Sequence, residues 1–369
     1  MNPEARPRIS VLIPVFNAES TLEECLGSVM GQSLESLEIV CVDDGSNDRS
    51  LEVLHGFQKA DARIRIVTHA RNQGEGAARN TGLDRARGHY VFHLDADDLL
   101  PPTALERLWR TAVDHNSQLV KGGFSMISET GETLGGKLGI PPDVSINTSL
   151  AESDFLKRIP GSHCSYLYQR TFLEEHGLRY RTDMSIGLDL VMLAGALTLA
   201  SRVSLIPEVV YCYRQTSESA TRGQTSLSMV REDLQTKGLV HDTLAHAGFE
   251  DAARDVLRRW DWHISAFWMS LPEDLDPAEL KKVFQRWRSM IPGGFVPWTP
   301  SSPLKHRYFL TLILQRRHPE AIAFLEELRS GIPFERHEQV AQRCADVLAL
   351  APEDAEAALF AESQGGCAG

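Results

Sequence analysis

Strand-like and helix-like segments alternate four times between residues 8 and 100, and this alternation constrains the fold more than any other feature of the sequence. Short apolar runs such as ISVLIPV and EIVCV are each followed by a helical pattern, as in STLEECLGSVMGQS. Strands and helices in this order form a parallel sheet with helices on both faces. Ligands bind such sheets where the loops leave the carboxyl ends of the strands, so we expect a functional site at that edge.

The fourth strand of this series leads into three carboxylates within four positions. In YVFHLDADDLLPP, residues 90–102, Asp95, Asp97 and Asp98 follow an apolar run. Like charges this close repel and raise one another's pKa, so the cluster indicates a bound cation rather than a gain in stability. Carboxylate oxygens suit Mg²⁺ or Mn²⁺, ions that keep few protein ligands and complete their shell with phosphate oxygens. Asp98 is also placed to cap the helix that follows, but capping does not explain the other two acids.

Turn-forming or acidic residues follow two further strands. Asp43 and Asp44 end the second strand, and PVFN ends the first. An Asx-type turn into GSND accounts for Asp43, which leaves Asp44 as the better candidate for a ligand contact. Carboxylates from two strands therefore converge on one edge of the predicted sheet, which favours a binding site there.

The composition fits a soluble protein of two domains. The 369 residues exceed the usual size of one compact domain, and near residue 220 alternating strands and helices give way to consecutive helices. A net charge of −12 argues against a general nucleic-acid binder. No apolar run reaches the roughly 18 residues of a membrane span, and the N-terminus lacks a signal-peptide pattern. The six cysteines are scattered, so we expect a cytoplasmic protein with reduced thiols.

A basic, tryptophan-rich stretch lies in the C-terminal region. Residues 281–319 contain eight Lys or Arg residues and no Asp or Glu, and five of the six tryptophans lie in or just before this stretch. Such a stretch suits contact with an anionic membrane surface, at about 1 kcal/mol per charge. Tryptophan at helical spacing is also typical of a helical core with a solvated basic face. Both interpretations stay open, and the first would place the protein at the inner face of the membrane.

Other catalytic motifs are absent from the sequence. The thirteen histidines form no HExxH or His/Cys cluster, which argues against zinc. There is no GxSxG, Walker A or kinase motif set. GEGAARNTG begins like a dinucleotide-binding fingerprint, but Arg79 replaces its third glycine, and the segment follows the third strand instead of the first. Its glycines fit close packing of a helix start on the sheet.

Four segments in register through residues 9–215 resemble the family 2 glycosyltransferases, which have the GT-A fold. They are the opening VLIPVFNAESTLEECLGSVMGQS, the DDGS turn in EIVCVDDGSNDRS, the helix in NQGEGAARNTGLDRARG and the DxD motif in YVFHLDADD. The resemblance implies an α/β GT-A domain in 1–220, with a mostly parallel sheet flanked by helices. Its donor-binding half would be about 8–100 and its acceptor half 101–220. Residues 221–369 would form an all-helical domain for acceptor, membrane-surface or partner contacts.

The resemblance also implies roles on the donor side. Pro14 and Phe16 would flank the base of the nucleotide, and Asp44 would hydrogen-bond its pyrimidine ring, expected to be uracil. Asp95 would contact the ribose or the metal, and Asp97 would ligate the Mn²⁺ or Mg²⁺ that bridges the diphosphate. The positive charge missing from the acid cluster would then be a divalent cation bound with a nucleotide sugar.

Three further residues are candidates for donor binding. Asn72 and Arg79 lie in the third loop and in the helix after it, and Arg79 would reach a phosphate or pair with a nearby acid, alternatives that stay open. Arg214 ends a segment that resembles the family's Tyr-x-Tyr-Arg and would contact the diphosphate. Gln215 follows where some members have a metal-binding histidine, so no such ligand is expected.

The resemblance implies that Asp189 is the general base. The family has a Glu-Asp pair at the start of a helix, and here Leu188 and Asp189 occupy that place. Asp189 is the only acid from Ile186 to Ala200, and apolar surroundings raise a carboxyl pKa, so we expect a raised value that suits a base near neutral pH. A carboxylate that only favours the helix dipole is the alternative. Leu188 in place of glutamate bears on acceptor positioning, and Asp183 is the second candidate for the base.

The function implied by the resemblance is that of an inverting glycosyltransferase of the hexosyl- or N-acetylhexosaminyltransferase class. It would move a sugar from a nucleotide diphosphate sugar, expected to be a UDP-sugar, to a hydroxyl of a glycan, lipid-linked or protein acceptor in bacterial surface polysaccharide or glycan assembly. Leu188 and the helical C-terminal region motivate an alternative, a non-catalytic subunit that binds nucleotide sugars or glycans. A sugar nucleotidyltransferase would share a related α/β half, but the N-terminal Gly-rich loop and lysine of those enzymes are missing.

Overall fold

The computed structural model describes residues 6–159, 163–215 and 227–256, together with shorter pieces of the C-terminal region. These pieces are 278, 280–282, 284–285, 308–309, 311–313, 315–329, 342–343 and 346. The chain divides into two compact units, Met1–Thr221 with Asp242–Ala252 and Arg222–His241 with Ala253–Gly369. A domain boundary near residue 220 stays a prediction.

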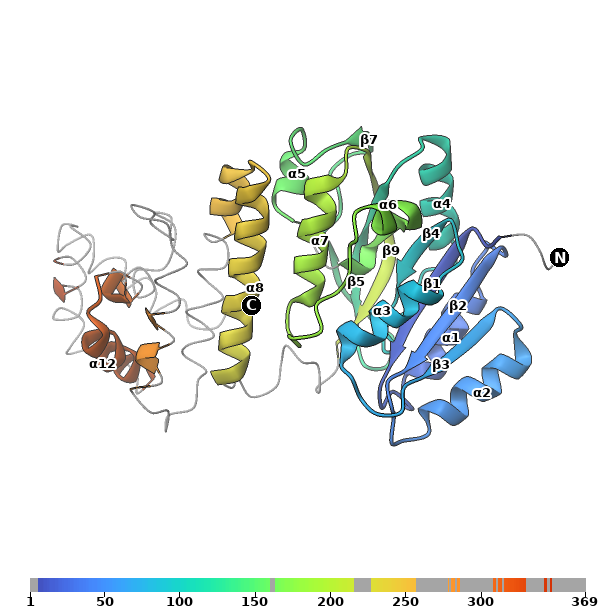
Figure 1. The fold of residues 1–369 in the computed structure, drawn as a ribbon, viewed down its shortest axis with the longest axis horizontal. Coiled ribbons are helices and arrows are strands. Elements are labelled where there is room, and N and C mark those ends of the chain that lie inside the picture. Colours follow the sequence, from blue (N-terminus) through green and yellow to red (C-terminus); the bar gives the residue numbers. More distant parts are fainter. Residues whose placement is uncertain are drawn as a thin grey trace. The chain divides into compact units, whose positions relative to one another are not determined.

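A nine-stranded sheet forms the core of the first unit (Figure 1). Its first four strands are parallel and lie in the order β3-β2-β1-β4. Their bounds are β1 Ile9–Val15, β2 Leu37–Asp43, β3 Ile64–Thr68 and β4 Tyr90–His93. Almost every residue of β1, β2 and β4 is buried, as expected for parallel strands with both faces covered. The strand predictions for this half of the sheet are confirmed.

Each of these four strands is followed by a helix. The helices are α1 Leu22–Met30, α2 Ser50–Ala60, α3 Glu75–Arg85 and α4 Ala104–Asp114. The buried positions of α1 have the helical spacing that predicted this helix, and they are Leu22, Cys25, Leu26 and Val29. Helix α3 lies close to β1, because a Cβ added at Gly82 would already be 3.4 Å from the Leu12 side chain.

The remaining strands make the sheet mixed. β8 runs antiparallel between β4 and β5, β9 is parallel to β5, β7 is antiparallel to β9, and β6 pairs with β5 alone. Their bounds are β5 Leu119–Ile127, β6 Thr133–Leu138, β7 Ser145–Thr148, β8 Tyr166–Gln169 and β9 Val203–Arg214. The α/β class is confirmed, but the expected mostly parallel order holds only for the first half of the sheet.

Short helices connect the strands of the second half. They are α5 Asp154–Lys157, the 3₁₀ helix η1 His163–Ser165 and α6 Arg170–Glu175, followed by the longer α7 Leu188–Leu199. Helix α7 begins after Gly187, whose φ of 71° lies in the left-handed region that glycine adopts without strain. The chain therefore turns sharply just before Leu188 and Asp189.

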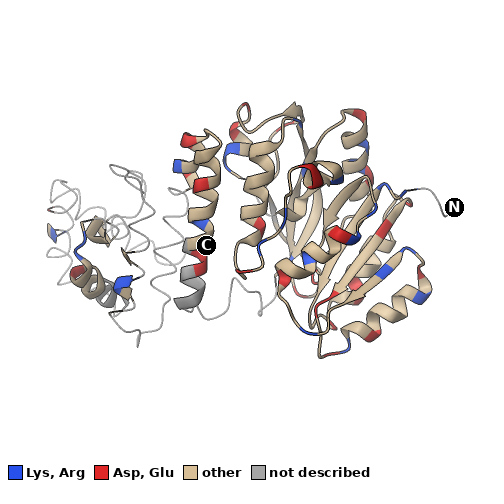
Figure 2. Ribbon diagram, viewed as in Figure 1, with Lys and Arg blue, Asp and Glu red and all other residues tan. Residues whose placement is uncertain are grey.

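The C-terminal part of the chain includes α8 Leu227–His246 and α12 His318–Arg329. Among the described residues, no helix is long and apolar enough to cross a membrane. Most of the basic stretch 281–319, and the tryptophans beside it, lie outside the described residues. On the first unit, acidic and basic residues are mixed along the outer helices α2 and α4 (Figure 2).

Candidate functional site

The carboxyl ends of β1, β2 and β4 meet at one edge of the sheet. Asp44 donates its backbone N–H to Val15 O at 2.8 Å, which joins the end of β2 to the end of β1. The acid loop, residues 94–98, begins where Leu94 donates its backbone N–H to Leu12 O at 3.0 Å. The structure thus places Asp44 and the acid loop at the edge where parallel sheets bind ligands.

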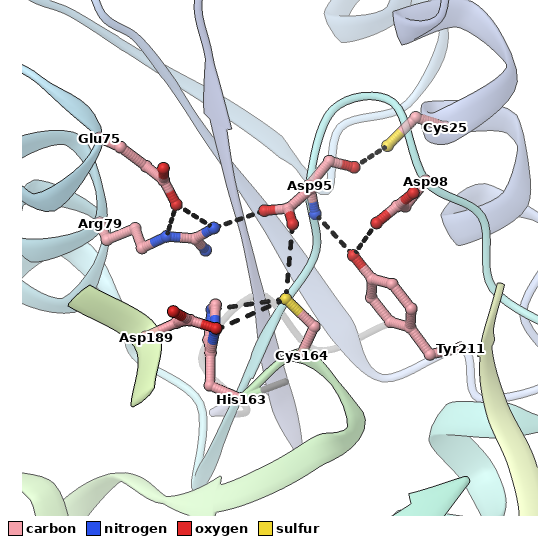
Figure 3. Close-up of polar contacts among 9 residues, drawn as sticks. All are labelled: Cys25, Glu75, Arg79, Asp95, Asp98, His163, Cys164, Asp189 and Tyr211. Atoms are coloured by element: carbon pink, nitrogen blue, oxygen red, sulfur yellow. Dashed lines mark hydrogen bonds and ion pairs between the residues drawn. The ribbon is translucent and has the colours of Figure 1, made fainter. Parts of the chain in front are cut away.

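Arg79 compensates the charge of Asp95 (Figure 3). The buried guanidinium of Arg79 donates from Nη2 to Asp95 Oδ1 at 2.5 Å and from Nε to Glu75 Oε1 at 2.8 Å. Burial alone would raise the pKa of Asp95, but the charge and hydrogen bond of Arg79, together with His163 and Cys164, lower it overall. Arg79 therefore pairs with acids in this structure, and its contact with a phosphate stays a prediction.

The pKa of Asp97 is shifted in the opposite direction to that of Asp95. Burial and the neighbouring charge of Asp95 raise the pKa of Asp97 to about 6. Arg214 is near enough to oppose this shift, yet its guanidinium bonds the backbone carbonyl of Asp97 and not the carboxylate. Among the described side chains, Arg214 offsets only part of the negative charge of the Asp97 carboxylate, and none forms an ion pair with it.

The residues present fit a divalent cation that is bound together with a phosphate. In the described part of the chain, no group of three or more His, Cys, Asp or Glu side chains is arranged to hold a metal ion alone. One only partly compensated carboxylate, Asp97, with Asp95 beside it, instead suits an ion that takes most of its ligands from phosphate and water. Mg²⁺ and Mn²⁺ both accept such oxygen ligands.

Asp98 joins the acid loop to β9. Its carboxylate accepts from Tyr211 Oη at 2.5 Å and from the backbone N–H of Arg214 at 2.6 Å. The suggestion that Asp98 caps the next helix is wrong, because the N-cap of α4 is Thr103, which makes no side-chain cap bond. Leu99, the residue after the acid loop, instead pairs with Cys212 of β9, and this pairing places Asp98 in the interior, where burial raises its pKa far above the usual value.

Arg214 is held on three sides by protein groups. Its guanidinium donates to Glu24 Oε2 at 2.5 Å, to Asp97 O at 2.7 Å and to Glu129 O at 2.5 Å. The side chain is buried, so these bonds fix the end of β9 against α1 and the acid loop. Its proposed contact with a diphosphate stays a prediction.

Asp44 organises the loop that follows β3. Its buried carboxylate accepts from the backbone N–H groups of Gln73 at 3.0 Å and Gly74 at 2.8 Å, and lies 2.6 Å from His69 Nδ1. Asp43 accepts from the backbone N–H of Ser46 at 3.4 Å, in the turn predicted for it. The pyrimidine contact expected of Asp44 stays a prediction, and the observed role is to shape this loop.

The same edge of the sheet also contains the other residues that are predicted to bind the nucleotide. Pro14 is partly buried near the end of β1, whereas Phe16 just beyond it is 45% exposed. Asn72 is exposed and accepts from the backbone N–H of Gly74 at 3.0 Å. An exposed aromatic ring beside an ordered loop provides a surface on which a base can stack, but no described contact tests that role.

Asp189 lies in the first turn of α7 and faces His163. Its carboxylate Oδ2 is 3.6 Å from His163 Nδ1, and its side chain is 27% exposed. Burial raises the pKa of Asp189, but the hydrogen bond and charge of His163 lower it, and the net shift is downward. The expected raised pKa is therefore wrong, because the sequence does not show that a histidine from another element meets this acid. Asp183, the second candidate, pairs with exposed Arg181.

Two neighbouring residues lie between Asp95 and Asp189 that the sequence did not indicate as site residues. They are His163 and Cys164. Cys164 Sγ is 3.6 Å from Asp95 Oδ2 and 3.4 Å from His163 Nε2, as Figure 3 shows. Both residues belong to η1 and are buried. No local pattern marks a three-residue 3₁₀ helix as part of a site, so sequence reasoning had no signal for them.

Helix α3 also holds the segment that precedes α7. Asn80 donates from Nδ2 to Tyr180 O at 2.8 Å, and its Oδ1 accepts from the Tyr180 backbone N–H at 2.9 Å. A Cβ added at Gly76 would lie 2.0 Å from Arg181 O, so only glycine permits this approach. The glycines of GEGAARNTG therefore have two roles, since Gly82 allows packing on the sheet and Gly76 allows packing on the segment before the predicted base.

Comparison with known proteins finds similarity to glycosyltransferases. Residues 10–177 match the family model described as Glycosyl transferase family 2. The uncharacterized glycosyltransferase EpsJ of Bacillus subtilis strain 168 is 32% identical over 223 residues, which are 58% of this chain and 63% of EpsJ. The succinoglycan biosynthesis protein ExoO of Rhizobium meliloti strain 1021 is 29% identical over 231 residues, 60% of this chain and 66% of ExoO.

The fold has a well-matched counterpart among solved structures. The crystal structure of S. aureus TarS 1–349 superposes with a TM-score of 0.68 at 18% identity, covering 89% of this chain and 93% of that one. The expected GT-A fold is therefore confirmed. The matches to EpsJ and ExoO span less than two thirds of the length of those proteins.

Proposed function

We propose that this chain is an inverting glycosyltransferase that moves a sugar from a UDP-sugar to an acceptor hydroxyl in the assembly of a bacterial surface polysaccharide. The observation that carries the proposal is the contrast within the acid loop, where Arg79 compensates Asp95 but the charge of Asp97 is only partly offset. A carboxylate in that state, at the ligand-binding edge of the sheet, suits a cation that arrives with a diphosphate.

The proposed reaction uses Asp189 as the general base. Asp189 takes the proton from the acceptor hydroxyl, the oxygen forms a bond to the anomeric carbon, and the bond from that carbon to the diphosphate breaks. Attack from the face opposite the diphosphate inverts the anomeric configuration. The lowered pKa of Asp189 keeps its carboxylate ionised at neutral pH and so able to accept a proton. A Mn²⁺ or Mg²⁺ ion held by Asp97 and Asp95 would offset the charge that develops on the leaving diphosphate.

Uridine is the nucleoside that the comparisons favour. The structures of TarS 1–349 include complexes with UDP and with UDP-GlcNAc, at TM-scores of 0.65 and 0.67 to this chain. We infer that Pro14, Phe16, Asp44 and Asn72 bind the nucleoside and that Arg214 supports the diphosphate side. The donor sugar is proposed to be a hexose or an N-acetylhexosamine, and the acceptor a glycan, lipid-linked or protein hydroxyl.

A thermal-shift panel tests the donor and the metal together. UDP, GDP, CDP and dTDP are each added with Mn²⁺, with Mg²⁺ or with chelator to the wild type and to Asp97→Asn. Ligand at about 100 times its Kd stabilises a fold by about 2.7 kcal/mol, a shift of a few degrees at this size. We expect a metal-dependent shift with UDP that is lost in Asp97→Asn and kept in Asp84→Asn, a matched change of an aspartate whose side chain is 64% exposed. No shift with any nucleotide would contradict the proposal.

The burial of Leu188 favours a second candidate function. This side chain is 3% exposed, so it cannot meet an acceptor as the family's glutamate would. A non-catalytic subunit that binds a nucleotide sugar would show the UDP shift but release no UDP from any acceptor mixture. Detection of UDP release, together with an inverted anomeric signal by NMR, would reject this alternative.

We propose that residues 221–369 form a separate helical domain and that its basic stretch contacts the inner face of the membrane. The support is the charge pattern of 281–319, with eight Lys or Arg residues and no acid. The full chain should then pellet with vesicles containing phosphatidylglycerol and remain in the supernatant with phosphatidylcholine vesicles. Equal behaviour with both vesicles would leave the basic face without a membrane role.

A further inference from the structure

The imidazole of His163 is enclosed by the predicted base and by two buried rings. Its Nδ1 is 3.6 Å from Asp189 Oδ2, and the residue is 2% exposed. The ring centroid lies 5.3 Å from that of His93 and 5.5 Å from that of Tyr180, both in edge-to-face geometry. These contacts hold the plane of the ring, so the nitrogen that meets Asp189 is fixed in direction.

The backbone of His163 is fixed as well. Tyr168 Oη donates to His163 O at 3.2 Å, and the residue begins the 3₁₀ helix η1. On its other side the ring lies beside Cys164 Sγ, which also approaches Asp95 Oδ2 at 3.6 Å. Asp189, His163, Cys164 and Asp95 are therefore consecutive neighbours from the acceptor side of the site to the donor side (Figure 3).

The titratable groups around this histidine divide into neutral and charged ones. Burial lowers the pKa of His93 well below its usual value and raises the pKa of Tyr168 and Tyr180, so these three rings are uncharged at neutral pH. Cys164 adjoins the ring, and it contributes a thiol contact to the carboxylate of Asp95.

The charged groups near the ring are Asp189, Asp95 and Arg79. The guanidinium of Arg79 bonds directly to Asp95 and to Glu75. It lowers the pKa of Asp189 only as the last and smallest cause, after the contributions of His163. Among the described residues, His163 is therefore the side chain that acts most on the Asp189 carboxylate.

We propose that His163 is a positioning residue, which holds the carboxylate of Asp189 in the orientation that accepts the proton of the acceptor hydroxyl. The proposal rests on the proposed function, because it assigns His163 a part in the same reaction. The ring of His163 is buried, and the proposed effect on the reaction is exerted through Asp189. A histidine that served only to fill space would be replaced by phenylalanine without loss, which separates the two explanations.

Two substitutions separate the nitrogen from the ring. His163→Phe keeps an aromatic ring between His93 and Tyr180 but removes the donor to Asp189. His163→Asn loses the ring and keeps an N–H donor near the place of Nδ1. His55→Phe, on the exposed face of α2, makes the same chemical change away from the site and serves as the control.

Steady-state kinetics over a range of pH give the first readout. We expect His163→Phe to lower kcat about 10- to 100-fold, by analogy with side chains that orient metal ligands, with the KM for the donor unchanged. The acidic limb of its pH profile should move to higher pH, because the imidazole that lowers the pKa of Asp189 is gone. His163→Asn should recover most of kcat, and His55→Phe should match the wild type.

A second readout needs no turnover. The ¹³C signal of the Asp189 carboxyl, assigned by its loss in Asp189→Asn, should titrate at higher pH in His163→Phe than in the wild type. If this shift occurs but no acceptor or donor is ever consumed, the proposed function fails while the pairing of His163 with Asp189 stands. An unmoved titration in folded His163→Phe, or equal loss of activity in the Phe and Asn variants, would overturn the proposal.

Discussion

The proposed donor side and the proposed acceptor side of this site shift the pKa of the same chemical group, an aspartate carboxylate, in opposite directions. On the donor side, burial and Asp95 raise the pKa of Asp97 to about 6, and no side chain of the described residues forms an ion pair with it. On the acceptor side, burial raises the pKa of Asp189, but the contributions of His163, with smaller ones from Leu190 and Arg79, lower it overall. The difference shows that the neighbouring groups decide which role each aspartate can have. A carboxylate without an ion-pair partner suits a bound cation, whereas a carboxylate with a lowered pKa stays ionised and can act as a base.

The sharpest test of this comparison is Asp189→Asn. Asparagine cannot accept the proton, so kcat should fall roughly 10²- to 10⁴-fold. Binding of UDP with metal should be unchanged, because the donor side is intact. The measurement is UDP release under saturating donor, with the thermal shift as the binding control. Wild-type activity in this variant would remove Asp189 from the mechanism.

Arg79→Met tests the compensated half of the donor side. Arg79 is buried and Asp95 is 32% exposed, so removing the cation leaves a carboxylate that water reaches only in part. We expect the free energy of unfolding to fall by about 2–4 kcal/mol, near the lower end of values for a broken buried pair. Urea denaturation measures the loss. The control is Arg110→Met, where the arginine is 72% exposed and its ion pair should contribute little.

Asp97→Asn in the presence of chelator tests the half that is only partly compensated. The folded-state pKa of about 6 lies above the usual aspartate value of 3.8, so the ionised form destabilises the fold increasingly as the pH rises between these values. Asparagine should therefore stabilise the metal-free protein by up to about 3 kcal/mol at pH 8 and have little effect below pH 4. Melting temperatures at several pH values check this. A stabilisation that does not depend on pH would mean that ionisation of Asp97 costs the fold nothing.

The smallest expected effect is that of Tyr211→Phe. This change removes the hydrogen bond to buried Asp98 and the one that Tyr211 Oη accepts from the backbone N–H of Asp95 at 3.3 Å, and it keeps the ring in place beside Phe92. The backbone N–H of Arg214 still donates to Asp98, so the loss should be about 1–2 kcal/mol. Chemical denaturation gives the value. Because these bonds join the acid loop to β9, the affinity for UDP with metal should also weaken, and an unchanged affinity would show that this attachment does not matter for the donor side.

The first hundred residues could be predicted from the sequence because their determinants are local. The apolar runs of β1 and β2 and the spacing of α1 appear directly in the chain. The acid loop follows from the same logic, since a strand end in a parallel sheet places what comes next at the ligand-binding edge.

The second half depended on contacts that no local pattern records. β8 has four residues and runs antiparallel between β4 and β5, a position that periodicity cannot give. Asp98 was misplaced because its partners are on β9, and the pKa of Asp189 was misjudged because His163 comes from η1. In each case a residue distant in sequence decided the behaviour of an acid.

The loop after β3 illustrates how such a site can change its ligand preference while its backbone conformation is kept. Asp44 holds this loop by accepting hydrogen bonds from the main-chain N–H groups of Gln73 and Gly74. Every residue type except proline provides such a donor. The exposed side chains of Arg71 and Gln73 do not contribute to these hydrogen bonds. Substitutions at these two positions can therefore change the chemical groups that a ligand would meet, while the backbone conformation of the loop stays the same.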